Sequence, residues 1–318
     1  MLPDSGLHFA SSLLSAPYAM ASGQPVGRRI RSGHPMELQL PVFLAVLSAA
    51  ALHAGWNALV KIRLDPFLAM TLICVSCGII ALAALPITGL PNREAWIWVA
   101  ASTVLHLFYY LFLAEAYRRA DMSQVYPIAR GAAPLVTAVI SLAFIHDPMS
   151  PGNVVGIALL GLGVLLISLK GQRGSVVPSR AAVIYALLTA GTISLYTVVD
   201  GIGARTAGSP NSYAAALFAV DAYPMLAICL WRKGLEGIRP AFKFLLPGFA
   251  GGAMSLAAYW IVIWAMTVAP IALVAATRET SVLFGGLIAV VFLKEPFTPV
   301  RGISAVLILL GLVFMRLG

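Results

Sequence analysis

The sequence has very little charge for its length. Only 10% of its 318 residues are Asp, Glu, Lys or Arg, whereas about a quarter of a typical soluble domain is charged. Hydrophobic residues make up 60%, and a folded chain of this size still exposes much of its surface. A single buried core cannot hide so much apolar surface. The composition therefore excludes a soluble enzyme and indicates a protein that has lipid as its solvent.

Several motifs that carry chemistry are absent from the sequence. There is no G-x-x-x-x-G-K-[ST] loop to cradle a nucleotide phosphate, and no His-Glu-x-x-His pair to hold zinc. No group of His, Cys and acidic residues has the spacing of a metal site. We therefore expect no enzymatic activity, no cofactor and no bound metal.

Cysteine is also scarce, with Cys74, Cys77 and Cys229 all inside apolar runs. Cys74 and Cys77 have the spacing of a redox pair, but Ile, Leu, Val and Ala surround them. Small buried helix residues are the better interpretation.

Positive charge exceeds negative charge, with 21 Lys and Arg against 12 Asp and Glu. In a soluble protein, a formal net charge of +9 would indicate a nucleic-acid partner. Here the basic residues lie mostly in short loops between apolar runs, where they act as topology signals beside anionic lipid headgroups. We expect a lipid bilayer and a small-molecule substrate as partners, and no nucleic acid.

Long apolar runs fill most of the chain. A helix needs about 20 mostly apolar residues to cross a bilayer. Such runs predict about ten transmembrane helices, over residues 40–60, 66–86, 95–117, 123–145, 151–169, 180–199, 211–231, 243–266, 270–293 and 299–317. The runs are too long for barrel strands. We expect an all-α, multi-pass protein of the cell (inner) membrane.

Residues 1–35 differ from the rest, since they are rich in Ser, Gly and Pro and end in a basic cluster. Their apolar stretch is interrupted by Pro17 and is too short to span a bilayer. We expect residues 1–35 to be a disordered tail or a mis-assigned start, with Met36 as the true first residue.

The sequence repeats itself at a spacing of 148 residues, which aligns Arg130 with Arg278 and Pro151 with Pro299. The same register aligns Asp147-Pro148 with Glu295-Pro296. Apolar composition alone does not explain matched arginines, prolines and acids. We expect two five-helix units, residues 36–175 and 176–318. Because five is odd, the second unit enters the membrane from the opposite side, as in many secondary transporters.

Three segments have a more specific pattern. They are Leu52-His-Ala-Gly-Trp-Asn-Ala-Leu-Val-Lys61, Ala116-Tyr-Arg-Arg-Ala-Asp121 through Tyr126-Pro-Ile-Ala-Arg130, and Lys294-Glu295-Pro296. These segments resemble the EamA-type, ten-helix permeases of the drug/metabolite transporter superfamily, and the resemblance covers residues 40–317. It implies ten helices, a central substrate cavity and no ATP requirement. The superfamily's usual Gly-Glu at the end of the first repeat is His146-Asp147 here, which keeps the charge.

Arg130 and Arg278 lie within predicted helices, away from their ends. A cation in the bilayer costs about 3 kcal/mol or more unless it faces a cavity or a partner. One hypothesis is that both arginines face a central cavity and bind an anionic group, because a guanidinium pairs with carboxylate or phosphate in two-point geometry. The alternative is that Glu279, Glu115 or Asp221 neutralises each arginine and that the pair only fastens helices together.

Other polar and aromatic side chains share helix faces. His53, Trp56 and Asn57 have i, i+3, i+4 spacing, and such faces suit a cavity that stacks on a small solute. The alternative for the aromatic residues is helix packing or an interfacial belt. The predicted substrate-binding residues are Arg130, Arg278, Trp56, Asn57, His53, Tyr109, Tyr196 and Tyr259.

Acidic residues within the apolar runs are candidates for proton coupling, because an intramembrane carboxyl group can take up and release a proton. Glu279 and Asp221 are the predicted coupling residues. Asp200 is expected at a helix end, and Glu115 near the headgroups with Arg118 and Arg119.

These observations predict a secondary transporter of a small polar metabolite, anionic or zwitterionic, that works by alternating access as a monomer or homodimer. A proton-coupled exporter of drugs or organic cations is the alternative within transport, with Glu279 or Asp221 as its binding charge. A membrane enzyme or a structural membrane subunit is the alternative of another class.

Overall fold

The computed structural model describes residues 38–59, 64–120, 122–169, 179–291, 294 and 297–318. Helices are the only regular secondary structure in these ranges, so the all-α prediction is confirmed for them. The expectations for residues 1–35 and for Glu295-Pro296 lie outside the described residues.

The first half of the described chain consists of five long helices. They are α3 (Leu40–Leu59), α4 (Pro66–Thr88), α5 (Trp96–Arg119), α6 (Met122–Ile140) and α7 (Pro151–Leu169), with the short 3₁₀ turn η2 (Arg93–Ala95) before α5. A π-helical turn, η3 (Ser141–Ile145), follows α6 directly. Pro begins α4, where its missing N–H is not needed, and the Asp65 side chain accepts a hydrogen bond from the Leu68 N–H as an N-cap.

The second half repeats this order with one helix in two pieces. Its helices are α8 (Arg180–Thr206), α9 (Pro210–Ile238), α10 (Leu245–Val268), α11 (Ile271–Arg278), α12 (Ser281–Val291) and α13 (Pro299–Leu317), with the 3₁₀ turn η4 (Arg239–Phe244) before α10. Ser179 and Thr298 cap α8 and α13, since their hydroxyls accept from backbone N–H groups of the first turn.

The helices follow the apolar runs closely, with three differences. The helix predicted to end at residue 199 continues to Thr206, and α9 continues to Ile238 through a kink at Gly234, where φ is 62°. The helix predicted over 270–293 is interrupted between α11 and α12. By length and composition, eight stretches of the described chain can cross a membrane. One of them, Pro210–Val268, includes both α9 and α10, and Pro151–Ile167 is a shorter apolar helix.

Many large apolar side chains lie on the outside of the helices. Ile79, Leu82, Ile97, Leu187 and Leu309 are each more than half exposed. A soluble protein rarely exposes so much apolar surface in contact with water. These faces therefore fit a hydrocarbon environment, as the composition predicts.

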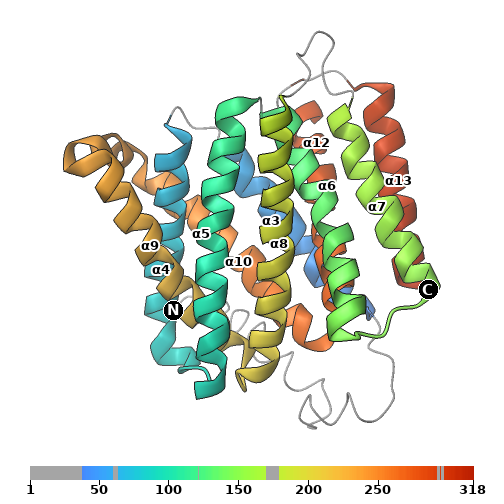
Figure 1. Ribbon diagram of the computed structural model, residues 1–318, viewed down its shortest axis with the longest axis horizontal. Helices are drawn as coiled ribbons and strands as arrows, with labels where there is room; N and C mark the ends of the chain where they lie inside the picture. The colour runs from blue at the N-terminus through green and yellow to red at the C-terminus, as the bar shows by residue number, and fades with distance from the viewer. Residues whose placement is uncertain (1–37, 60–63, 121, 170–178, 292–293, 295–296) are drawn as a thin grey trace, which may run out of the picture. The chain divides into compact units, whose positions relative to one another are not determined.

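Helices of the two halves pack against each other in matched pairs. Two of these pairs join helices at the same place in each half. The second helices pack together, α4 on α9, and so do the last helices, α7 on α13 (Figure 1). In the other pairs, the third helix of one half packs on the first helix of the other half: α5 packs on α8, and α10 packs on α3. Likewise α6 contacts α8, and α11 and α12 contact α3. The interior is therefore built from both halves together.

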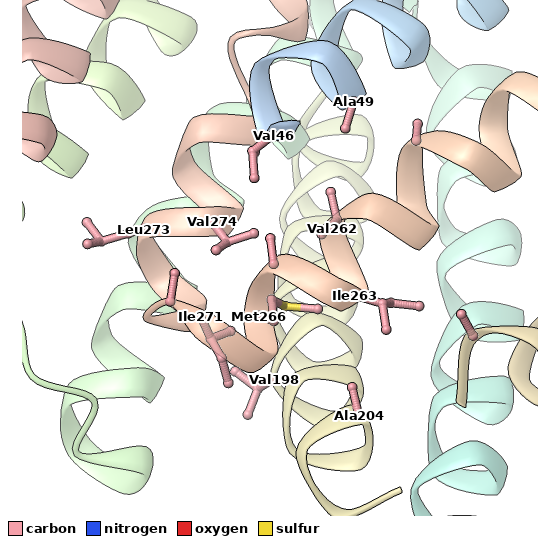
Figure 2. Close-up of a cluster of buried hydrophobic side chains, with 14 of the residues drawn as sticks. Val46, Ala49, Val198, Ala204, Val262, Ile263, Met266, Ile271, Leu273 and Val274 are labelled. Atoms are coloured by element: carbon pink, nitrogen blue, oxygen red, sulfur yellow. The ribbon is translucent and has the colours of Figure 1, made fainter. Parts of the chain in front are cut away.

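Small and branched aliphatic side chains fill the crossing of four of these helices (Figure 2). The labelled side chains come from α3 (Val46, Ala49), α8 (Val198, Ala204), α10 (Val262, Ile263, Met266) and α11 (Ile271, Leu273, Val274). This packing leaves the short helix α11 buried along its whole length. It places the end of α11 at the centre of the bundle.

Glycines allow α7 and α13 to approach closely. A Cβ atom added at Gly156 would lie 2.7 Å from the Gly311 carbonyl oxygen and 2.8 Å from the Met315 nitrogen. A Cβ atom at Gly311 would lie 2.7 Å from the Gly156 carbonyl oxygen. The Gly152-x-x-x-Gly156 motif therefore serves packing within the chain.

We expect Gly156→Ala to destabilise the protein by about 1–3 kcal/mol, because the added methyl group meets backbone atoms that cannot move aside. Gly285→Ala in α12 is the matched control, since a Cβ atom there has no neighbour within 4 Å. The control should be neutral or stabilising by up to about 1 kcal/mol through helix propensity. Thermal unfolding in detergent compares the two, and equal midpoints would contradict the close contact.

Candidate functional site

A cavity lies between the two halves of the described chain, with a volume of about 80 Å³. A single water needs roughly 10–15 Å³ on the same measure, so the space holds several waters or a small solute. The lining residues come from α3 (Ala49, His53, Trp56), α4 (Met70, Ile73, Cys74, Cys77), α5 (His106, Tyr109, Tyr110), α6 (Arg130), α8 (Tyr196), α9 (Phe218, Asp221), α10 (Ser255, Ala258, Tyr259) and α11 (Arg278).

The break between α11 and α12 forms one end of this site. Residues 269–281 are all buried, although they include the charged pair Arg278 and Glu279. The Glu279 N–H donates to the Ala276 carbonyl and the Thr280 N–H to the Thr277 carbonyl, which are the shorter i→i−3 bonds of a 3₁₀ turn. The turn ends α11 inside the bundle and presents adjacent charged side chains there.

One carboxylate holds both buried arginines. Glu279 Oε2 lies 2.7 Å from Arg130 Nε, and Glu279 Oε1 lies 3.4 Å from Arg278 Nη2. The side chains of these three residues are at most 5% exposed. The two guanidinium groups and the one carboxylate together carry a net charge of one positive unit, beside the cavity that both arginines line.

His53 connects this charged group to α3. Its Nε2 lies 3.2 Å from Arg130 Nη2, and its Nδ1 lies 3.2 Å from Trp56 Nε1. Arginine and tryptophan can only donate, whereas a neutral imidazole has one acceptor nitrogen. His53 therefore satisfies only one of the two donors at a time. In addition, Arg278 Nε has no hydrogen-bond partner among the described residues.

Two further buried acids are held by tyrosine hydroxyls, and of these Asp221 lines the cavity whereas Asp200 does not. Tyr110 Oη donates to Asp221 Oδ2 at 3.0 Å. Tyr213 and Tyr259 donate to the two oxygens of Asp200 at 3.0 and 2.6 Å. The expectation that Asp200 ends a helix is wrong, since α8 continues to Thr206 and Asp200 is fully buried.

Aromatic rings form much of the remaining wall. The rings of His106 and Tyr196 are stacked with centroids 4.1 Å apart. Tyr109 and Tyr259 meet Tyr196 edge-on, with centroids 5.8 and 6.0 Å away. The guanidinium carbon of Arg278 lies 5.5 Å from the centre of the Tyr259 ring, within the range of a cation–π contact.

The structure brings most of the predicted site residues together. Arg130, Arg278, Trp56, His53, Tyr109, Tyr196, Tyr259 and Asp221 all line the cavity. Asn57 does not, because its amide donates to the His53 carbonyl one turn earlier. Glu279 is not among the lining residues, since it lies buried between the two arginines. Glu115 pairs with Arg118 and Arg119 near the end of α5, as expected.

Sequence reasoning did not select several lining residues. Tyr110, His106, Cys74, Cys77 and Phe218 all reach the cavity. Cys74 and Cys77 carried a usable signal, since small or polar residues at i, i+3 spacing mark a helix face that avoids lipid. Nothing in the sequence distinguishes Phe218 from packing residues.

A second buried ion pair ties the ends of four elements together. Arg205 Nη1 and Nη2 donate to the two oxygens of Asp147 at 2.8 and 3.1 Å. Arg205 also donates to the Met266 and Ala269 carbonyls at the end of α10. The Ile271 N–H, at the start of α11, donates to Asp147 Oδ2. We call this arrangement the Arg205–Asp147 clamp.

We expect Glu279→Gln to destabilise the protein by about 3–5 kcal/mol, because it leaves two adjacent guanidinium groups buried without their counter-charge. Glu115→Gln is the control, since its ion pairs are partly exposed and should be worth about 1 kcal/mol or less. Thermal midpoints in detergent measure both. Similar losses for the two variants would show that Glu279 does not hold the arginines.

We expect Arg205→Lys to destabilise the protein by about 2 kcal/mol or more, because an ammonium group cannot reproduce the two-point pairing and the carbonyl contacts. Arg239→Lys removes a guanidinium from an exposed pair with Glu236 and should change the midpoint little. An Arg205→Lys protein as stable as the control would contradict the clamp.

Comparison with known proteins gives a consistent family. The EamA-like transporter family matches residues 40–169 and 180–317. The "Probable 4-amino-4-deoxy-L-arabinose-phosphoundecaprenol flippase subunit ArnF" of Enterobacter sp. (strain 638) is 33% identical over 79 residues, which are 23% of this chain and 62% of that protein. The chain therefore spans less than two thirds of that relative's length. A structure described as "Crystal structure of protein" shares the fold, with a TM-score of 0.73, 20% identity and coverage of 87% of this chain and 96% of its own. The chain belongs to the EamA-like transporter family, within the drug/metabolite transporter superfamily.

Proposed function

We propose that the protein is a secondary transporter that carries a small polar solute, anionic or zwitterionic, across the cell membrane. Membership of the EamA-like transporter family supports transport. The observation that carries the substrate class is the charge of the cavity wall, where Glu279 is the one carboxylate among the described residues that pairs with both Arg130 and Arg278. An anionic group supplies the missing negative charge.

We propose further that ten helices span the membrane as two inverted units, residues 36–175 and 176–318. Three observations support this proposal: the 148-residue sequence repeat, the two separate matches to the family and the exchanged helix pairings of the two halves. On this view α11 and α12 together form one span that is the counterpart of α6.

With this architecture, the proposed transport mechanism is alternating access. The cavity takes its lining from both halves, so a rocking of one half against the other would open it to each side in turn. The proposed substrate contacts are Arg130, Arg278, Trp56 and His53 for the anionic group, with Tyr109, Tyr196 and Tyr259 as aromatic walls. Asn57 contributes indirectly, through its bond to the His53 carbonyl.

For proton coupling, Asp221 is a better candidate than Glu279. Protonation of Glu279 would leave two neighbouring guanidinium groups without a counter-charge. Asp221 has a tyrosine hydroxyl as its partner and lines the cavity, so it can exchange a proton with the solute space. The same position supports the rival function, an exporter of organic cations that uses Asp221 as its binding charge.

The lipid-linked substrate in the name of the flippase relative is not part of this proposal. A cavity of about 80 Å³ accommodates a small solute and not a polyprenyl chain. The name does join an amino group and a phosphate in one substrate, a combination that is compatible with a cavity containing both arginine and aspartate.

We expect purified protein in liposomes to take up a labelled organic anion or amino acid, and Arg278→Gln to lower that uptake by about tenfold or more, because a buried charged contact is lost. Arg239→Gln, at an exposed pair, is the control and should retain uptake. Uptake of organic cations alone, unaffected by Arg278→Gln, would favour the rival exporter.

A further inference from the structure

Asp221 differs from the other buried acids of the described chain in its surroundings. Glu279 and Asp147 each pair with arginine, and Asp200 receives two tyrosine hydroxyls. Asp221 is 5% exposed and faces the cavity. Its only hydrogen bond within the described residues comes from Tyr110 to Oδ2, which leaves Oδ1 without a donor.

A purely structural role explains Asp221 poorly. The bond to Tyr110 joins α9 to α5, but a neutral Asn would accept the same bond without burying a charge. A buried carboxylate without a cation is expensive in a membrane protein. Two things can compensate this charge: the coupled proton proposed above, or a positive group that arrives with the solute and takes the place of that proton.

We propose that the transported solute is a zwitterion, with its acidic group at Arg130 and Arg278 and its ammonium group at Asp221. This inference rests on the proposed carrier function and deepens it. It assigns Asp221 Oδ1 as the acceptor for the ammonium group, with Tyr110 holding the carboxylate in place through Oδ2.

The charges of the cavity agree with this assignment. At the cavity wall, Arg130, Arg278 and the Glu279 between them leave one positive charge, and Asp221 supplies one negative charge. Asp200 does not line the cavity, and its two oxygens accept from tyrosine hydroxyls. The acidic group of a zwitterion compensates the excess positive charge at the arginines, and its ammonium group compensates the charge of Asp221. A simple anion would leave Asp221 without a cation, and a simple cation would leave the arginine pair with its excess charge.

The wall around Asp221 also suits an ammonium group. Tyr109, Tyr110 and Phe218 line the same cavity, and aromatic faces attract cations. Phe218 lies three residues before Asp221 in α9, so the two side chains share a face of that helix. Cys74 and Cys77 also line the cavity, and they are small and neutral as thiols.

Matched probes test this proposal directly. Thermal shift of purified protein in detergent is measured with sets in which the acid lacks the amino group of the zwitterion and the amine lacks its acidic group: alanine, propionate and ethylamine; phenylalanine, 3-phenylpropionate and phenethylamine; phosphoethanolamine, ethyl phosphate and ethylamine. A ligand that binds the native state raises its apparent stability. In at least one set the zwitterion should bind about 30-fold or more tightly than the matched acid or amine, since each lacks one buried charge pair.

Two variants locate the groups. Asp221→Asn should weaken binding of the zwitterion by about 30-fold or more and leave the matched acid within about twofold, whereas Arg278→Gln should weaken both. Glu115→Gln, at a residue that does not line the cavity, is the control and should change neither. If Asp221→Asn does not fold, the ranking of the matched probes on the wild type still decides.

Three outcomes overturn the proposal. If an acid binds as tightly as its zwitterion and Asp221→Asn has no effect, the zwitterion inference fails while an anion carrier stands. If only the amines bind, both the inference and the proposed anionic contact fail. If no probe binds and liposomes show no uptake, the carrier function itself fails.

Discussion

The arrangement of the site depends on one carboxylate that neutralises two guanidinium groups inside a largely apolar bundle. Glu279 can reach Arg130 only because α11 ends at Arg278 and a 3₁₀ turn redirects the chain. The helix α11 is also buried along its whole length, and small side chains at its crossing with α3, α8 and α10 permit this burial (Figure 2). The packing of the core and the charge of the cavity therefore meet at the end of α11.

The two halves place their buried arginines differently. Arg130 lies in α6, which continues as a helix through its position, whereas Arg278 lies at the end of a helix that stops. Only the second half supplies the acid, so the pair of arginines cannot be neutralised within either half alone. The charged centre consequently joins the halves as well as forming the cavity wall, and a solute that binds there contacts both.

The sequence predicts the helices well and the site only in part. Lipid makes apolar length a reliable signal, so every described helix of the bundle lies where an apolar run predicts it. The 148-residue repeat identified both arginines. The pairing of Arg130 with Glu279 across helices, the burial of Asp200 and the exclusion of Asn57 from the cavity depend on how each helix is rotated about its axis. That rotation is set by contacts between distant residues, such as those of Tyr213 and Tyr259 with Asp200, and periodicity within one helix does not determine it.

The Arg205–Asp147 clamp has a kinetic consequence. Its contacts involve the segment between η3 and α7, the end of α8, the end of α10 and the start of α11. Because a single guanidinium makes four of these bonds, a motion that separates the elements cannot release them one by one at small displacements. The resistance to such a motion is concentrated into one step, so this end of the bundle would open in an all-or-none manner.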